Sequence, residues 1–175
     1  SAEDMNLRVV TDSYEPGSVF KALVCGMAID LGLVTPDTTF EVPAKIEVGD
    51  YMVGDSDHRD YGMTMTVREI MRRSSNTGMV LVGRKIGAEN FAKYLDTYCI
   101  GELSGVDFPG ESTGTVRELE DWDGSSLGSM SFGQGIAVSP IEVMRAVGAI
   151  ANKGVMRTPH FLQAKGGENV AWDEE

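Results

Sequence analysis

The stretch "YEPGSVFKALVCGMAI", residues 14 to 29, decides the fold of the chain around it. Pro16 fixes its own φ and has no N–H group, so it suits the first turn of a helix. Gly17 leaves the backbone room at that turn. The residues that follow are apolar at helical spacing on one face and largely apolar on the opposite face. Because such a helix belongs in a protein interior, the sequence predicts a buried helix that ends near Asp30.

One lysine lies inside this apolar helix. Ser18 and Lys21 are three residues apart, so they share one face near the helix N-terminus. In one interpretation Ser18 caps the helix and Lys21 extends its ammonium group to water. In the other, Lys21 removes the proton of the Ser18 hydroxyl, which is a poor nucleophile without a base. Burial and the positive potential of the helix N-terminus would lower the lysine pKa for that role, and the pattern alone leaves both interpretations open.

Composition limits the fold class and the partners. The chain has 175 residues, 42% of them hydrophobic, which is enough for one globular domain. A net charge of −12 argues against nucleic acid or an anionic membrane surface as partner. No apolar run approaches the ~20 residues that span a bilayer, so we expect any membrane anchor to lie outside this chain. A disulfide between Cys25 and Cys99 is less favoured than free thiols, because a cysteine on an apolar helix is usually a small core residue.

Short strands and a polar loop follow the first helix. Residues 37 to 66 are rich in β-forming residues, which are interrupted by prolines and glycines. Within them, the loop "DSDHRDYG" contains His58, and no second histidine or cysteine lies nearby at metal-ligand spacing. We therefore expect His58 to be a solvated loop residue.

Capping boxes predict the starts of two later helices. Thr66 with Glu69 begins one, and Ser139 with Glu142 begins the other, which has Pro140 as its first residue. The inner face of this last helix is predicted to carry Val143, Ala146, Val147 and Ile150.

The helix that begins after Thr66 is interrupted at "RRSSNTG", residues 72 to 78, and an apolar helix resumes at Met79. Serine, asparagine and glycine compete with helical hydrogen bonding, so a plain kink is one explanation. The other is that the break directs the Ser74 hydroxyl and the Asn76 amide into a cleft. A hydroxyl can relay a proton, and an amide can both donate to and accept from a substrate. Beside a serine–lysine pair, these groups suit acyl transfer.

Ser18-x-x-Lys21 together with Ser74-x-Asn76 resembles the motif set of penicillin-binding protein transpeptidases and their β-lactamase relatives. The flanking segments are similar as well and follow the family's order across nearly the whole chain. They include "YEPGSVFK", "TVREIMRRSSNTG", "DFPGESTG", "SFGQGIAVSPIEVMRAVGAIANKGV" and "RTP". The resemblance is strongest to class B enzymes, which are membrane-anchored bacterial proteins that cross-link peptidoglycan during cell division or elongation. It favours Ser18 as a nucleophile over Ser18 as a helix cap.

The resemblance implies a role for each site residue. Ser18 is the acylated nucleophile, Lys21 is its general base, and Ser74 carries the proton to the leaving group. Asn76 holds the substrate backbone and helps to order Lys21. The donor is a peptidoglycan stem peptide ending in D-Ala-D-Ala, and an amine of a neighbouring stem completes the cross-link. β-Lactam antibiotics acylate Ser18, no cofactor or metal is implied, and the expected location is the extracytoplasmic face of the bacterial membrane.

The family's third motif, Lys-Ser/Thr-Gly, is missing, because no lysine of the chain is followed by those residues. In the family this motif lies on a downstream strand of the central sheet. The resemblance therefore implies that residues 1–175 are a partial transpeptidase domain, the helical half of an α+β fold that lacks most of its central sheet. We expect such a piece to be inactive alone, and either to self-associate through the apolar face of the Ser18 helix or to cover that face with its own ends.

Two other function classes share these motifs. A β-lactamase or β-lactam sensor uses the same serine, lysine, serine and asparagine, but the flanking segments favour a transpeptidase. A degenerate domain could act as a non-catalytic scaffold in a cell-wall complex, although intact Ser18, Lys21, Ser74 and Asn76 argue against degeneracy.

Overall fold

The computed structural model describes residues 6–169. Its helical elements are short and follow the order α1 (Arg8–Thr11), the 3₁₀ turn η2 (Gly17–Phe20), α2 (Lys21–Asp30), α3 (Val67–Arg73), α4 (Asn76–Ile86), α5 (Ala88–Thr97), the 3₁₀ turn η3 (Leu119–Asp121), α6 (Ser126–Met130) and α7 (Pro140–Ala151). The strands are β1 (Thr39–Val42), β2 (Lys45–Val48), β3 (Tyr51–Gly54), β4 (Met63–Thr66), β5 (Ala164–Lys165) and β6 (Glu168–Asn169).

The strands form three separate antiparallel pairs among the described residues: β1 with β4, β2 with β3, and β5 with β6. In the first pair Phe40 lies opposite Met65, and in the second Ile46 lies opposite Val53. Within residues 6–169 no sheet has more than two strands. The expected helix-rich α+β fold is confirmed, and among the described residues the strands form no larger central sheet.

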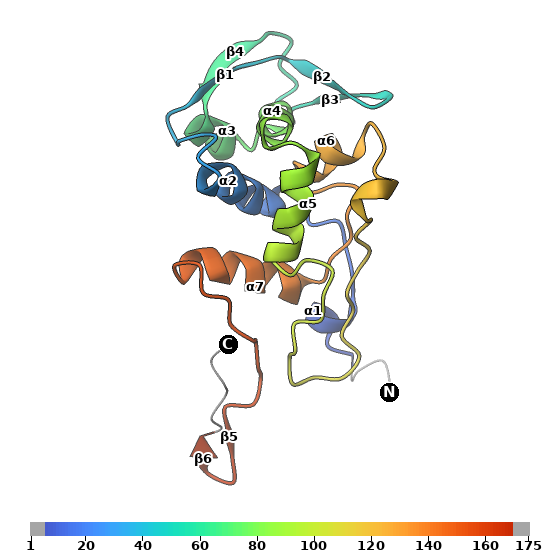
Figure 1. Ribbon diagram of the computed structural model, residues 1–175, viewed down its shortest axis with the longest axis vertical. Coiled ribbons are helices and arrows are strands. Elements are labelled where there is room, and N and C mark those ends of the chain that lie inside the picture. The colour runs from blue at the N-terminus through green and yellow to red at the C-terminus, as the bar shows by residue number, and fades with distance from the viewer. Residues whose placement is uncertain (1–5, 170–175) are drawn as a thin grey trace.

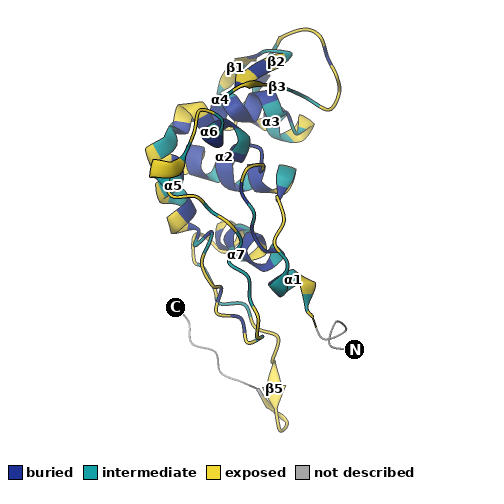
Figure 2. Ribbon diagram, turned by 90° about the vertical axis from the view of Figure 1, so that its right-hand side faces the viewer, coloured by how far each residue is buried: buried dark blue, intermediate teal, exposed yellow. Residues whose placement is uncertain are grey.

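The molecule is elongated, with the β1–β4 strands at one end and the β5–β6 hairpin at the other (Figure 1). Between them α2 packs against α4 and α7, and α4 also packs against α6. Buried residues concentrate in α2 and α4, whereas β5 is exposed (Figure 2). The core therefore surrounds the helix whose sequence predicted burial.

Most of the α2 segment is buried as predicted. The fully buried side chains are Phe20, Leu23, Val24, Met27 and Ala28. Val19 and Ile29, however, are 55% and 44% exposed. The expectation of burial on all faces is therefore wrong for one apolar stripe of this helix.

The predicted break between two helices is present, but α4 begins at Asn76 and not at Met79. The Ser75 side chain caps α4 by accepting a hydrogen bond from the Gly78 N–H at 3.0 Å. That bond satisfies an otherwise unpaired donor, which lets the helix start three residues earlier. Both predicted capping boxes are present, at the starts of α3 and α7.

The predicted inner face of α7 is correct for Val143 and Ala146, but Ile150 is 44% exposed. The buried face of α7 continues through Ala149, whereas the side chain of Ile150 lies near Gly26 of α2. His58 is exposed, as expected for a solvated loop residue. Cys25 and Cys99 are free thiols, so the less favoured disulfide is absent.

Candidate active site

Ser18 lies on an exposed turn that two glycines shape. Gly17 has a φ of +58°, a conformation in which a side chain would be strained. Its N–H donates to the carbonyl of Gly133 at 2.9 Å. A Cβ at Gly133 would collide with the Gly17 backbone, so the close contact between the two segments requires glycine there. The glycine-rich segment before α7 thereby fixes the turn that displays Ser18, which is exposed to solvent.

Lys21 is 1% exposed, although it lies at the first position of α2. Its Nζ donates to the Ser74 carbonyl oxygen at 2.7 Å, to Ser74 Oγ at 3.0 Å and to Asn76 Oδ1 at 2.7 Å. An ammonium group in such a position does not reach water, so the interpretation of Lys21 as a solvent-directed side chain is wrong. Ser18 does not cap the helix either, because Pro16 is the N-cap residue of the turn.

Ser74 connects Lys21 to Ser18. Its hydroxyl donates to Ser18 Oγ at 2.9 Å, and the same oxygen accepts from Lys21 Nζ. Ser74 has a φ of +53°, a left-handed conformation that ends α3. This turn brings both the carbonyl and the hydroxyl of Ser74 to Lys21, and a non-glycine residue pays about 1–3 kcal/mol for such a backbone. The two serines and the lysine thus form a continuous hydrogen-bonded chain.

The Asn76 side chain is oriented by a second hydrogen bond, to β3. Its Nδ2 donates to the Gly54 carbonyl of β3 at 3.2 Å, so its Oδ1 faces Lys21. The position at the N-terminus of α4 is set by the Ser75 cap described above. Ser18, Lys21, Ser74 and Asn76, the residues that the sequence singled out, are therefore brought together from two helix starts that are more than fifty residues apart.

The electrostatics favour a lysine that can lose its proton. Burial lowers the pKa of Lys21 to about 8, against the attraction of the Asp55 carboxylate, which raises it. The three acceptors that Lys21 contacts are a carbonyl, a hydroxyl and an amide oxygen, all of them neutral. Burial raises the pKa of the Cys25 thiol to about 11, so this neighbour is also neutral at physiological pH.

The sequence did not single out Asp55, which lies behind Ser74 and Asn76 in the loop after β3. Asp55 Oδ2 accepts from Ser75 Oγ at 2.7 Å, and Oδ1 accepts from the Thr77 N–H at 3.0 Å. Arg59 pairs with the same carboxylate at 3.1 Å, and both side chains are almost fully buried. The four-residue spacing of Asp55 and Arg59 is the one signal in the sequence, and it occurs equally in solvated loops.

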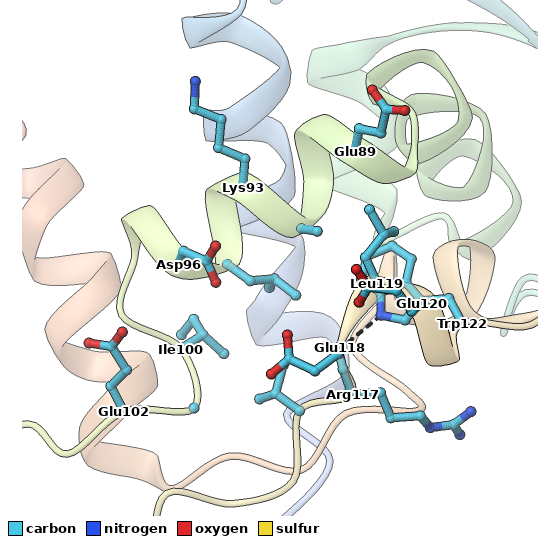
Figure 3. A pocket seen from close by; sticks show the side chains of 14 residues that line it. Glu89, Lys93, Asp96, Ile100, Glu102, Arg117, Glu118, Leu119, Glu120 and Trp122 are labelled. Atoms are coloured by element: carbon cyan, nitrogen blue, oxygen red, sulfur yellow. Dashed lines mark hydrogen bonds between the residues drawn. The ribbon is translucent and has the colours of Figure 1, made fainter.

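A separate cavity of about 430 Å³ lies between α5 and residues 116 to 122 (Figure 3). Trp122 closes one side of it and donates from Nε1 to the Arg117 carbonyl at 3.0 Å. None of Ser18, Lys21, Ser74 and Asn76 lines this cavity. It is therefore distinct from the serine–lysine site.

Residues 6–169 contain neither a candidate metal site nor a candidate membrane-spanning helix. No cluster of three or more histidine, cysteine or acidic side chains in that range is arranged to hold a metal ion. Nor does the described part contain a helix of the length and hydropathy that crossing a membrane requires.

Known proteins resemble this chain along nearly all of its length. A family model described as the penicillin binding protein transpeptidase domain matches residues 1–173. The penicillin-binding protein PbpB of Mycobacterium tuberculosis is 33% identical over 156 residues, which are 89% of this chain and 23% of that protein.

Solved structures agree with that match. A crystal structure from Atopobium parvulum, described provisionally as a peptidoglycan glycosyltransferase, has 47% identity and a TM-score of 0.93 over 99% of this chain and 41% of its own. Penicillin binding protein 3 of Mycobacterium tuberculosis, complexed with aztreonam, has 32% identity and a TM-score of 0.82 over 87% of this chain and 34% of its own. The chain thus spans about a quarter of the curated relative and less than half of the crystal chains.

Proposed function

The chain belongs to the penicillin-binding protein transpeptidase family, and from that premise we propose that it carries the acylation centre of a class B peptidoglycan D,D-transpeptidase. The observation that carries the proposal is the hydrogen-bonded chain from Lys21 through Ser74 to Ser18. A nucleophile, a base and a proton relay within hydrogen-bond distance are the parts that serine acyl transfer needs.

In the proposed acylation step, Ser18 Oγ attacks the carbonyl carbon of the penultimate D-alanine of a stem peptide. Neutral Lys21 accepts the proton of the hydroxyl, which its lowered pKa permits near neutral pH. The carbon–nitrogen bond to the last D-alanine then breaks, and the departing amine takes a proton from the lysine through Ser74 Oγ. The products are a Ser18 ester and free D-alanine.

In the second step an amine of a neighbouring stem attacks the ester. Lys21 accepts a proton from that amine and returns it to Ser18 Oγ as the ester bond breaks, so Ser18 leaves as its hydroxyl and a new amide bond forms the cross-link. The Asn76 amide is placed to bind the donor backbone while it orders Lys21. A β-lactam enters the same sequence at its first step, because Ser18 opens the ring amide and retains the acyl group. Complexes of the relative with aztreonam and ampicillin support this part of the proposal.

We propose that this chain is part of a longer protein, the parent, and the test is the site of acylation in that parent. We expect a fluorescent penicillin to label the parent on Ser18 and nowhere else within residues 1–175, as read by mass spectrometry of the labelled digest. Ser18→Ala should abolish the label, and Ser13→Ala, an exposed serine five residues earlier, should retain it. A label on Ser74, or one that survives Ser18→Ala, would overturn the assignment.

The same experiment separates the rival functions. A transpeptidase keeps the penicilloyl group for long periods, whereas a β-lactamase releases it, so the rate of label loss distinguishes the two. A non-catalytic scaffold takes up no label. We propose a parent at the extracytoplasmic face of the bacterial membrane, where peptidoglycan is assembled, with its anchor outside this chain.

We further propose that residues 1–175 are a partial transpeptidase domain with little activity of their own. The Ser18 N–H lies in the first turn of a helix, where it can donate to the oxyanion. A second donor and the substrate carboxylate site belong, in the family, to the strand with the Lys-Ser/Thr-Gly motif. Each such donor is worth about 10²–10³-fold in rate. The exposed stripe with Val19 and Ile29 also favours self-association of the isolated chain, which light scattering would detect.

A further inference from the structure

We propose that Asp55 is a positioning residue of this active site, which holds the Ser74–Asn76 turn against Lys21 and supplies the negative charge that the lysine faces. The inference rests on the proposed function, since it concerns how that site works, but it is carried by contacts of Asp55 that take no part in the serine–lysine chain.

Asp55 holds groups on both sides of Asn76. Its carboxylate accepts from the Ser75 hydroxyl at 2.7 Å and from the Thr77 N–H at 3.0 Å. These residues flank Asn76, whose Oδ1 contacts Lys21, and Ser75 follows Ser74 directly. The preceding residue, Gly54, accepts from Asn76 Nδ2. One short segment, Gly54–Asp55, therefore fixes the turn on both sides of the asparagine.

Asp55 is itself held by hydrogen bonds from Arg59. Arg59 donates to its Oδ2 from both Nε and Nη2, and to Thr77 Oγ1 at 3.0 Å. Nη1 of Arg59 donates to the backbone carbonyls of Val42 at 3.2 Å and Tyr61 at 2.6 Å, and Nη2 also donates to that of Pro43 at 2.7 Å. A planar guanidinium with several fixed partners is a rigid support. The strand end at β1 is thereby tied to the turn that carries Asn76.

The groups around Asp55 determine its charge state. Burial by itself raises the pKa of its carboxyl, but the hydrogen bonds from Thr77 and Ser75 and the pairing with Arg59 outweigh it and hold the pKa below its usual range. Asp55 is therefore an anion at neutral pH. A buried anion near Lys21 favours the protonated lysine, so Asp55 keeps the lysine pKa from falling further.

Among the groups that face Lys21 from the neighbouring elements, the negative charge comes from Asp55. From its own helix, Cys25 faces it as a neutral thiol. From the turn between α3 and α4, Ser74 and Asn76 offer neutral oxygens. From the loop after β3, Asp55 provides the anionic charge, with the permanent cation of Arg59 behind it. Removal of the Asp55 charge leaves Lys21 and Arg59 as two neighbouring buried cations.

The experiment is the rate of penicillin acylation against pH in the parent, for wild type, Asp55→Asn and Asp60→Asn. Asp60 is exposed in the same loop, so Asp60→Asn removes a charge of the same sign without touching the turn. We expect Asp55→Asn to lower the maximal rate by about 10²-fold, the cost of a misplaced catalytic group. We also expect the midpoint of its pH profile to move to lower pH, while Asp60→Asn keeps the wild-type rate and midpoint.

Loss of rate with an unmoved midpoint would overturn the proposal, because a merely structural role predicts that result. An unchanged rate would overturn it as well. Unfolded molecules take no label, so the midpoint of the pH profile describes the folded molecules alone, even if Asp55→Asn is unstable. Asp55→Glu, which restores the charge, should return the midpoint to its wild-type value, and failure to do so would contradict the charge effect. If wild type itself were not labelled on Ser18, the proposed function would fail, a result distinct from all of these.

Discussion

Two buried cationic side chains, Lys21 and Arg59, lie next to the Ser74–Asn76 turn, and the charge of their hydrogen-bond partners differs. Lys21 meets a carbonyl, a hydroxyl and an amide oxygen. Arg59 meets the Asp55 carboxylate, the Thr77 hydroxyl and backbone carbonyls. A lysine without a direct anionic partner can lose its proton, whereas an arginine remains charged in proteins. The difference assigns proton transfer to one cation and structural support to the other.

The largest effect should follow from making Lys21 resemble Arg59. Arginine keeps the positive charge but cannot act as a base, so Lys21→Arg should be as damaging as Lys21→Ala. Loss of the general base lowers acylation by about 10²–10⁴-fold. The second-order rate of penicillin acylation in the parent measures it. Lys45→Arg, on the exposed side of β2, is the matched control and should label normally. Substantial acylation by Lys21→Arg would mean that Lys21 contributes charge alone.

The next effect should follow from removing Arg59. Arg59→Met leaves the Asp55 carboxylate buried without its cation, which costs about 3–5 kcal/mol in the free energy of unfolding. Urea unfolding of the chain measures the change. The control is Arg68→Met, because Arg68 forms a 3.4 Å ion pair with Asp37 in which both side chains are largely exposed. An exposed pair contributes about 0–1 kcal/mol, so equal losses in the two variants would contradict the structural role of Arg59.

The same contrast explains how far the sequence could predict this site. Ser18 and Lys21 are separated by one helical turn, and Ser74 and Asn76 occupy a helix break, so local rules identify each pair. Their assembly into one site came from the resemblance to a family and not from local rules. The capping boxes at Thr66 and Ser139 were predictable for the same reason as the pairs, since each is completed within four residues.

The support around Asp55 was not predictable, because the other groups that Asp55 and Arg59 contact are mostly distant in sequence. Thr77 lies 22 residues away, and Arg59 reaches the Val42 carbonyl across 17 residues. In sequence, this loop has the polar composition of a solvated segment, and its burial becomes apparent once β1, β2 and β3 pack against α4. Ile150 was misplaced for a related reason. Periodicity locates an apolar stripe on a helix, but the packing of neighbouring helices decides where that stripe ends.

A smaller effect should follow from giving Lys21 the anionic partner that Arg59 has. Asn76→Asp has nearly the same shape and places a carboxylate where Oδ1 now accepts from Lys21 at 2.7 Å. An opposite charge at that distance raises a lysine pKa by about 1–3 units, from its present value of about 8. The midpoint of the acylation pH profile should therefore move upward, the reverse of Asp55→Asn.

Asn90→Asp is the matched control, since Asn90 is an exposed residue at the start of α5. Its pH profile should coincide with that of wild type. An Asn76→Asp midpoint at or below the wild-type value would show that the neutrality of the Lys21 partners does not govern its protonation.

The smallest effect should come from Cys25, which faces Lys21 from the same helix. Its thiol is buried and donates to Met79 Sδ at 3.8 Å. Because burial raises the pKa of Cys25 to about 11, the group is uncharged wherever Lys21 titrates. Cys25→Ala should therefore lower the stability by about 1 kcal/mol, as a small core truncation does, and leave the acylation midpoint in place. The pH profile of the parent measures the midpoint, and thermal unfolding measures the stability. A thiolate would instead raise the lysine pKa, so a midpoint that falls in Cys25→Ala would mean that Lys21 has a second anionic neighbour besides Asp55, and the contrast with Arg59 would be one of degree.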